Sequence, residues 1–173
     1  MEDQLILVDI FDNPAGTGQK LAVHQKGRLH RAFSVFVYRG NKMLLQKRSA
    51  GKYHSGGLWT NACCSHPRQG EELSEAVERR LEEELGVRMP VEELYSFVYR
   101  AQFEKGLTEY EYDHVFLGEY DGEIRLNEEE ASEIRWMDMD ELAEDLWKNP
   151  EKYTAWFLIA APQVLRRFIL RAR

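Results

Sequence analysis

The segment Arg79-Arg80-Leu81-Glu82-Glu83-Glu84-Leu85-Gly86-Val87 decides how this chain folds. It ends a stretch in which leucine or valine recurs every fourth residue, at positions 73, 77, 81 and 85, as one face of a helix requires. Gly86, directly after the last of these, is a typical residue to end a helix. The sequence therefore predicts a helix over about 72–85. Its arginines and glutamates could form an ordinary solvated face with i, i+4 pairs, or they could belong to a site.

Strand patterns lie on both sides of this helix. Strands are predicted where apolar or aromatic residues dominate, at 5–10, 94–103, 108–118 and 134–137. A β-hairpin is predicted from the similar pattern at 30–38 and 43–46. Residues 12–16 are predicted to form a turn. Residues 138–147 and 151–171 are predicted to form helices, the second kinked or interrupted by Pro162. Strands with helices between and after them predict an α/β fold, in which helices cover a mixed sheet.

The composition is that of a folded domain. The 173 residues are 43% hydrophobic and 31% charged, which excludes a mostly disordered chain and suits one domain over residues 1–173. The formal net charge of -7 argues against a general nucleic-acid-binding protein, which is usually basic. An anionic small molecule would need a local basic cluster or a bound metal ion.

Targeting patterns and cysteine usage predict a location. The N-terminus is acidic and lacks the basic region of a signal peptide. The longest apolar run, 155–161, is much shorter than the roughly 20 residues that cross a bilayer. Cys63 and Cys64 are the only cysteines, and because they are adjacent they form no disulfide framework, which indicates a reducing compartment. We therefore expect a cytoplasmic protein that does not bind membranes.

The strand pattern at 108–118 carries a row of carboxylates. Glu109, Glu111 and Asp113 alternate with aromatic residues at 110, 112 and 116 and with a histidine at 114. Residues two apart in a strand point to the same face. We expect the aromatic face to pack on the core and the carboxylate face to meet solvent, cations or a metal ion. A solvated acidic face is the ordinary alternative, and hard divalent cations favour clustered carboxylates.

Cysteines and histidines are the other candidates for chemistry. Cys64 could be a small buried hydrophobe or a reactive thiol beside a metal or basic groups. Adjacent side chains of an extended chain point to opposite sides, so only one of Cys63 and Cys64 can face a substrate. The five histidines are scattered, and spacing alone brings none of them together. We assign His54 no role beyond surface charge.

The predicted helix and its upstream flank resemble the Nudix box, G-x5-E-x7-R-E-U-x-E-E-x-G-U, where U is apolar. The matching residues are Glu71, Arg79, Leu81, Glu83, Glu84, Gly86 and Val87. The chain departs from the box at Ser65, in place of the first glycine, and at Arg80, in place of a glutamate. The resemblance implies a Nudix-type α/β/α sandwich with a mixed sheet. Arg80 argues against ordinary Nudix pyrophosphohydrolysis, because it replaces a metal-binding carboxylate.

Three flanking blocks resemble the type 1 isopentenyl-diphosphate isomerase family. Residues 59–67, W-T-N-A-C-C-S-H-P, are similar to its T-N-x-x-C-S/G-H-P signature. Residues 28–34, R-L-H-R-A-F-S, resemble its R-L-H-x-A-F-S block, and residues 108–116, T-E-Y-E-Y-D-H-V-F, resemble its E-x-E-x-x-x-V-F block. The similarity runs in order from about Val8 to Trp156.

The resemblance implies an enzyme that interconverts isopentenyl diphosphate and dimethylallyl diphosphate. The reaction adds a proton at one carbon and removes one from another. Cys64 and Glu111 match the two proton-handling residues, Tyr99 assists Glu111, and Cys63 matches a variable position. Trp156 matches a residue that stabilises a tertiary carbocation through its aromatic face, although plain core packing would also account for a tryptophan there.

The resemblance also implies two metal ions and a diphosphate site. The family holds one divalent ion with three histidines and two glutamates, which match His24, His30, His66, Glu109 and Glu111. Mg²⁺, Mn²⁺ and Zn²⁺ all suit such mixed ligands. A second ion, Mg²⁺, is expected to bridge the diphosphate and Glu84. The basic residues expected to hold the diphosphate are Lys20, Arg48, Lys52 and Arg80.

Two other functions stay open from the sequence. One is a Nudix hydrolase of a nucleoside diphosphate derivative, which would use the helix carboxylates as its main metal site. The other is a Nudix-like binding module without catalysis, which would not need Cys64 and Glu111 together. If the chain is an isomerase, we expect it to bind a small diphosphate substrate and to bind neither nucleic acid nor a membrane. We also expect it to be a monomer.

Overall fold

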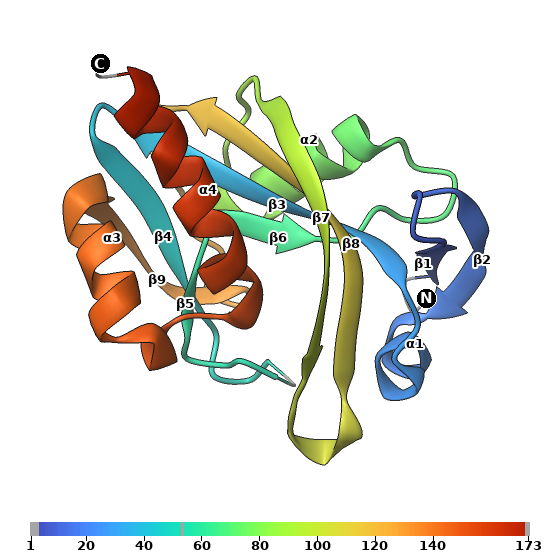
Figure 1. Cartoon of the computed structure of the whole chain (residues 1–173). Helices are drawn as coiled ribbons and strands as arrows, with labels where there is room; N and C mark the ends of the chain where they lie inside the picture. Colours follow the sequence, from blue (N-terminus) through green and yellow to red (C-terminus); the bar gives the residue numbers. More distant parts are fainter. Residues whose placement is uncertain (1–3, 53, 172–173) are drawn as a thin grey trace.

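A mixed sheet lies between two layers of helices in the computed structural model, which describes residues 4–52 and 54–171 (Figure 1). Helix α2 (Leu73–Leu85) covers one face of the sheet. Helices α3 (Met139–Lys148) and α4 (Ala155–Arg171) cover the other face. The predicted α/β/α sandwich is therefore confirmed.

The sheet has nine strands within the described residues, and it is mixed because β3 and β8 run parallel while the other pairs are antiparallel. The strands are β1 (Gln4–Val8), β2 (Pro14–Gln19), β3 (His30–Arg39), β4 (Lys42–Arg48), β5 (Trp59–Thr60), β6 (Cys63–Ser65), β7 (Glu92–Gln102), β8 (Thr108–Glu119) and β9 (Ala131–Asp138). The short helical elements are α1 (Lys20–Lys26), η1 (Glu104–Gly106) and η2 (Pro150–Lys152).

Alternating side chains of the central strand β3 build a core on each face of the sheet. Phe33 and Val35 are buried on the α2 side, where they share a cluster with Leu81. Phe36 points to the opposite face and stacks on Phe157 of α4, with ring centroids 5.7 Å apart. The period of two along the strand therefore supplies both hydrophobic layers.

Strands β3 and β4 separate soon after their shared turn, and this separation opens the site. They pair only at Tyr38–Met43 and Arg39–Lys42. Beyond these pairs β3 joins β6 on one side and β8 on the other, while β4 joins β5 and β9. Side chains of β3, β4 and β6 line one cavity, described below.

Four local predictions are wrong. Helix α4 continues through Pro162 without the predicted interruption. Helix α1 is absent from the prediction, and residues 14–16 lie in strand β2 rather than in a turn. The carboxylate face of β8 is also the buried one, whereas Tyr110 and Tyr112 are only half-buried. The reason is that Val115 and Leu117 point to the same face of β8 as the carboxylates, and they pack in the core beneath α4. Glu109 and Glu111 tolerate this burial because hydrogen-bonding partners surround them, as the site shows.

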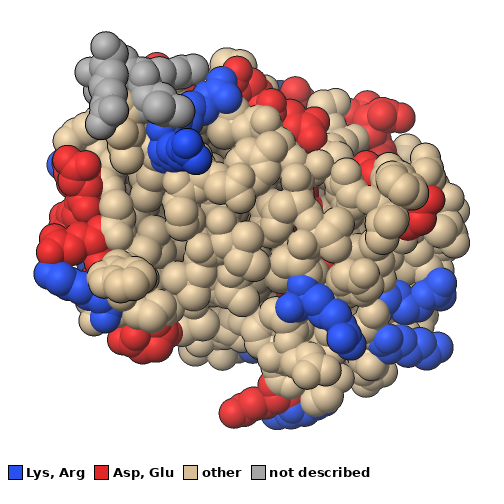
Figure 2. Space-filling view, viewed as in Figure 1, with Lys and Arg blue, Asp and Glu red and all other residues tan. Residues whose placement is uncertain are grey.

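The surface is charged mainly at its periphery in the view of Figure 2. Uncharged side chains cover its centre, over much of α4, whereas the lower part of the β7–β8 hairpin carries charged side chains in this view. Within the described residues, no helix is both long and apolar enough to span a bilayer. The basic side chains that matter for an anionic ligand lie in the cavity.

Candidate active site

A cavity of about 330 Å³ collects most of the predicted site residues. Its walls include side chains from α1, β3, β4, β6, α2, β8 and α4. The predicted residues that line it are Lys20, Arg48, Lys52, Cys64, His66, Arg80, Glu84, Glu109, Glu111 and Trp156. The remaining three, His24, His30 and Tyr99, are buried beside these carboxylates. The fold thus brings together every residue that the resemblance selected.

Strand register explains how distant segments meet. His30 on β3 is the parallel neighbour of Glu111 on β8, and Tyr99 on β7 is its antiparallel neighbour. The three side chains therefore form one row across three adjacent strands. His24 approaches the row from α1, and His66 approaches from the segment after β6.

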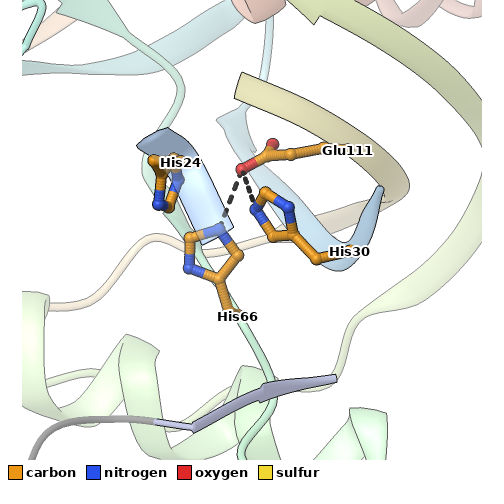
Figure 3. A group of neighbouring side chains, drawn as sticks. All are labelled: His24, His30, His66 and Glu111. Carbon is orange, nitrogen blue, oxygen red and sulfur yellow. Dashed lines mark hydrogen bonds and ion pairs between the residues drawn. The ribbon is translucent and has the colours of Figure 1, made fainter. Parts of the chain in front are cut away.

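Three imidazoles converge on Glu111 (Figure 3). Oε1 of Glu111 lies 2.8 Å from Nε2 of His66 and 3.4 Å from Nε2 of His30. The outer nitrogens are held by backbone: Nδ1 of His24 lies 2.6 Å from the carbonyl of Lys20, and Nδ1 of His30 lies 2.9 Å from that of Arg28. Such contacts favour a proton on Nδ1 and leave the Nε2 lone pairs directed inward.

The second carboxylate, Glu109, is linked to Glu111 through Tyr99. The hydroxyl of Tyr99 lies between them, 2.7 Å from Oε2 of Glu111 and within hydrogen-bonding distance of Oε2 of Glu109. Burial, together with the two carboxylates, raises the pKa of Tyr99 well above its ordinary value. Tyr99 therefore stays a hydrogen-bond donor.

The protonation states suit metal binding. Burial lowers the pKa of His24, and it lowers the pKa of His66 to about 4, so both imidazoles are neutral at pH 7. Burial alone would raise the pKa of Glu111, but the neighbouring imidazoles of His30 and His66 hold it well below its ordinary value. Burial lowers the pKa of His30, but Glu111 outweighs this effect and raises it, so a metal ion bound there would displace the proton of that ring. Neutral imidazoles and an ionised carboxylate are the forms that bind metals.

These side chains fit a divalent metal ion. The ligand atoms of His24, His30, His66 and Glu111 all lie within 4.8 Å of one another. The buried Nε2 of His30 has no hydrogen-bond partner among the described residues. Convergent nitrogen and oxygen donors with such an unused lone pair form a site that can hold an ion.

A second polar group forms at α2. Glu84 is buried, accepts a hydrogen bond from Nε2 of Gln46 at 3.0 Å and pairs with Arg80. Glu130 lies 2.5 Å from Nζ of Lys52 and 3.3 Å from Arg80, so it ties two predicted diphosphate-binding residues together. Sequence reasoning missed Gln46 and Glu130. Glu130 is one of three consecutive glutamates, so its type alone did not single it out.

The neighbouring cysteines lie on opposite faces of β6. Cys63 is fully buried in the core beneath α2, whereas Cys64 lines the cavity. Burial raises the pKa of Cys64 to about 12, and it raises the pKa of Cys63 well above its ordinary value. The cavity therefore contains one thiol, which is protonated at neutral pH.

His54 is the main residue that the sequence did not predict. It is only 7% exposed and lines the cavity, so the assignment to the surface is wrong. Its Nε2 lies 2.7 Å from Oε1 of Glu109, and its ring stacks on Phe103 at 4.5 Å. The only local signal is its position two residues after Lys52.

Trp156 of α4 closes another wall of the cavity. It is buried, and the guanidinium of Arg48 lies 5.2 Å from the centroid of its ring. Its aromatic side is thus already next to a cation, although it is also part of the hydrophobic core.

Comparison with known proteins identifies the family. The NUDIX domain family matches residues 28–157. The Isopentenyl-diphosphate Delta-isomerase 2 of Aromatoleum aromaticum is 51% identical over 166 residues, which are 95% of this chain and 88% of the relative. The chain belongs to the isopentenyl-diphosphate Delta-isomerase family. Another family member, the Isopentenyl-diphosphate Delta-isomerase 2 of Photorhabdus laumondii, is 51% identical over 91% of this chain and 89% of its own.

Solved structures agree on the fold of this isomerase family member. A Deinococcus radiodurans protein superposes with a TM-score of 0.76 and 20% identity, covering 95% of this chain and 98% of its own. The MutT protein of Methanosarcina mazei gives a TM-score of 0.63 at 18% identity, covering 84% of this chain and 96% of its own. At these identities the likeness shows the fold alone. Both the predicted fold and the predicted family are therefore confirmed.

Proposed function

We propose that this chain interconverts isopentenyl diphosphate and dimethylallyl diphosphate, with Cys64 and Glu111 as its proton-handling residues. One observation carries the proposal: a thiol and a carboxylate line the same cavity from strands that lie on either side of β3. A 1,3-shift of a double bond needs one group to deliver a proton and another to remove one. Residues on separate strands can reach different carbons of a substrate that lies between them.

The resting protonation of the pair suits this task. The pKa of about 12 keeps the Cys64 thiol protonated, and the lowered pKa of Glu111 keeps its carboxylate ionised. The pair thus holds one donor and one acceptor, as a reversible proton shift requires. Tyr99 holds Oε2 of Glu111 in place, which leaves Oε1 toward His30 and His66.

The diphosphate is held at the basic end of the cavity in this proposal. The cationic side chains there are Lys20, Arg48, Lys52 and Arg80. Glu84 would hold the Mg²⁺ that accompanies the diphosphate, with Gln46 orienting its carboxylate. A few local cations suffice for a chain of net charge -7, because the field inside a cleft depends on nearby charges.

The His/Glu ion would be held by His24, His30, His66, Glu109 and Glu111. Mn²⁺, Mg²⁺ and Zn²⁺ suit this ligand set. When bound, the ion supplies positive charge that favours the ionised form of the carboxylate beside it. Trp156 would face the tertiary carbocation, a contact worth about 2 kcal/mol when desolvated.

A hydrolase of nucleoside diphosphate derivatives is a poorer fit to the site. Such an enzyme needs a cluster of α2 carboxylates as its main metal site, but Arg80 stands in place of one of them, and of the described α2 carboxylates only Glu84 lines the cavity. A binding module without catalysis would not need a thiol and a carboxylate, Cys64 and Glu111, in the same cavity. One chain supplies every residue of the proposed site, so we expect a monomer to be active.

A direct assay tests this function. The purified chain is incubated with isopentenyl diphosphate and Mg²⁺, and the acid-labile allylic diphosphate is measured. We expect product to form, to disappear after treatment with a chelator and to return when divalent metal is restored. The absence of product, with rapid hydrolysis of nucleoside diphosphate derivatives instead, would refute the proposal.

A further inference from the structure

His54 is a fourth histidine at the His/Glu cluster, and the resemblance gives it no role. It lies in the segment between β4 and β5, and it is buried. Its Nε2 lies 2.7 Å from Oε1 of Glu109, and the same oxygen lies 3.7 Å from Nε2 of His24. Two imidazole nitrogens from separate segments therefore face one carboxylate oxygen, just as those of His30 and His66 face Glu111.

The spacing of these atoms is that of neighbouring ligands around one ion. The donor atoms of His24, His54 and Glu109 all lie within 4.8 Å of one another. Nitrogen and oxygen ligands sit about 2.0–2.2 Å from zinc, so neighbouring ligands are separated by roughly 3–3.5 Å. The distances of 2.7 and 3.7 Å lie on either side of this range, so small shifts would bring all three donors onto an ion.

The ring of His54 is also oriented like a ligand. Its Nδ1 lies 3.1 Å from Oγ of Ser55, as the Nδ1 atoms of His24 and His30 lie beside backbone carbonyls. A metal-binding histidine typically donates its outer N–H to such an oxygen. Phe103 stacks on the ring, and Trp156 meets it edge-on with centroids 6.1 Å apart. These contacts fix Nε2 toward Glu109 before any ion arrives.

We propose that His54 is a direct ligand of the metal centre, which then has four imidazoles. This proposal depends on one part of the proposed function, namely that the His/Glu cluster holds a metal ion. His24 belongs to both donor groups, with His30, His66 and Glu111 in one and with His54 and Glu109 in the other. Since Nδ1 of His24 is already held by Lys20, its Nε2 can bind only one ion. His54 therefore joins the same centre rather than forming a second.

This ligand has a consequence for the diphosphate end of the cavity. His54 follows Lys52 by two residues, and the guanidinium of Arg48 reaches the backbone carbonyl of His54 at 3.5 Å. A metal ion bound to His54 holds this segment against the centre, and with it the two cations that flank the substrate.

The test uses Zn²⁺ alone and the full chain. Zinc affinity is measured by competition with a chelator, and the number of imidazole ligands by X-ray absorption, for the wild type and for His54→Ala and His54→Gln. His114→Gln is the matched control, because His114 lies on the other face of β8 and pairs with Asp12 and Glu93. We expect four imidazoles in the wild type and the control, and three in both His54 variants. Affinity in the variants should fall by more than the roughly 10–100-fold typical of an outer-shell change.

The glutamine variant makes the proposal refutable. Its amide keeps a hydrogen-bond donor toward Glu109 but is not an imidazole. Wild-type affinity in His54→Gln, or three imidazoles in the wild type, would show that His54 only orients Glu109 and would overturn the proposal. A wild type that binds no zinc would instead refute the whole metal site, and the isomerase assay would decide separately whether the chain is active.

Discussion

Tyr99 and Glu111 face each other across the antiparallel pair β7–β8, with the tyrosine hydroxyl 2.7 Å from Oε2 of the carboxylate. The same hydroxyl also contacts Glu109, so one buried group links both carboxylates of the proposed metal centre. His30 lies on the opposite side of Glu111, in the neighbouring strand β3. Glu111 is therefore fixed from both sides, and its remaining freedom is toward the cavity.

Replacing Tyr99 with phenylalanine should lower kcat and leave KM for the substrate nearly unchanged. The substitution removes the donor that orients Glu111 but leaves the cations proposed to bind the diphosphate intact. Loss of such an orienting partner typically costs roughly 10–100-fold in activity. Steady-state kinetics of Tyr95→Phe provide the control, because Tyr95 lies on the same strand and its hydroxyl donates to the carbonyl of Ala160, away from the site. A rise in KM with unchanged kcat would contradict this role for Tyr99.

Alkylation of the thiols should depend strongly on pH. The thiolate is the reactive form, and the pKa of Cys64 is raised to about 12, so the reactive fraction should grow about tenfold for each pH unit between 7 and 10. An ordinary cysteine would level off near its pKa of about 8.5. Peptide mapping after iodoacetamide treatment should find Cys64 modified before Cys63, which is fully buried, and bound substrate should protect it. A plateau near pH 9 would show that the Cys64 thiol is not shielded as described.

Hydrolysis of nucleoside diphosphate derivatives should be negligible. Arg80 stands where a hydrolase has a carboxylate, and of the described α2 carboxylates only Glu84 lines the cavity, so the helix lacks the carboxylate cluster of a hydrolytic metal site. Release of phosphate or nucleoside monophosphate is measured across common derivatives with Mg²⁺ or Mn²⁺. Fast metal-dependent turnover of any of them would favour the hydrolase.

Part of the site follows from local sequence patterns. The alternation along β8 correctly places Glu109 and Glu111 on one face, and the period of four with Gly86 predicts α2 to within one residue at its start and to the residue at its end. Alternation does not say which face is buried when both faces of a sheet are covered, so the core side of β8 was mispredicted. Helix α1 is only seven residues long, too short for a periodic signal, yet it delivers His24.

The remaining part depends on contacts that no local pattern encodes. The parallel pairing of His30 with Glu111 joins strands that are far apart in sequence, and only the assembled sheet fixes that register. His54 reaches Glu109 from a segment whose described residues form no helix or strand, so neither periodicity nor spacing placed it in the cluster. The family resemblance selected the other site residues because it matches them position by position along the sequence. It therefore does not depend on knowing how the strands pair.

Turnover of isopentenyl diphosphate in D₂O tests most directly whether Cys64 and Glu111 move the protons of an allylic rearrangement. Wild-type protein should give dimethylallyl diphosphate with deuterium in the newly formed methyl group, measured by NMR and mass spectrometry. Cys64→Ser and Glu111→Gln should slow this conversion by roughly 10²–10⁴-fold. Cys63→Ser should remain close to wild type, because Cys63 faces the α2 core. Unchanged turnover in Cys64→Ser together with lost turnover in Cys63→Ser would contradict the account.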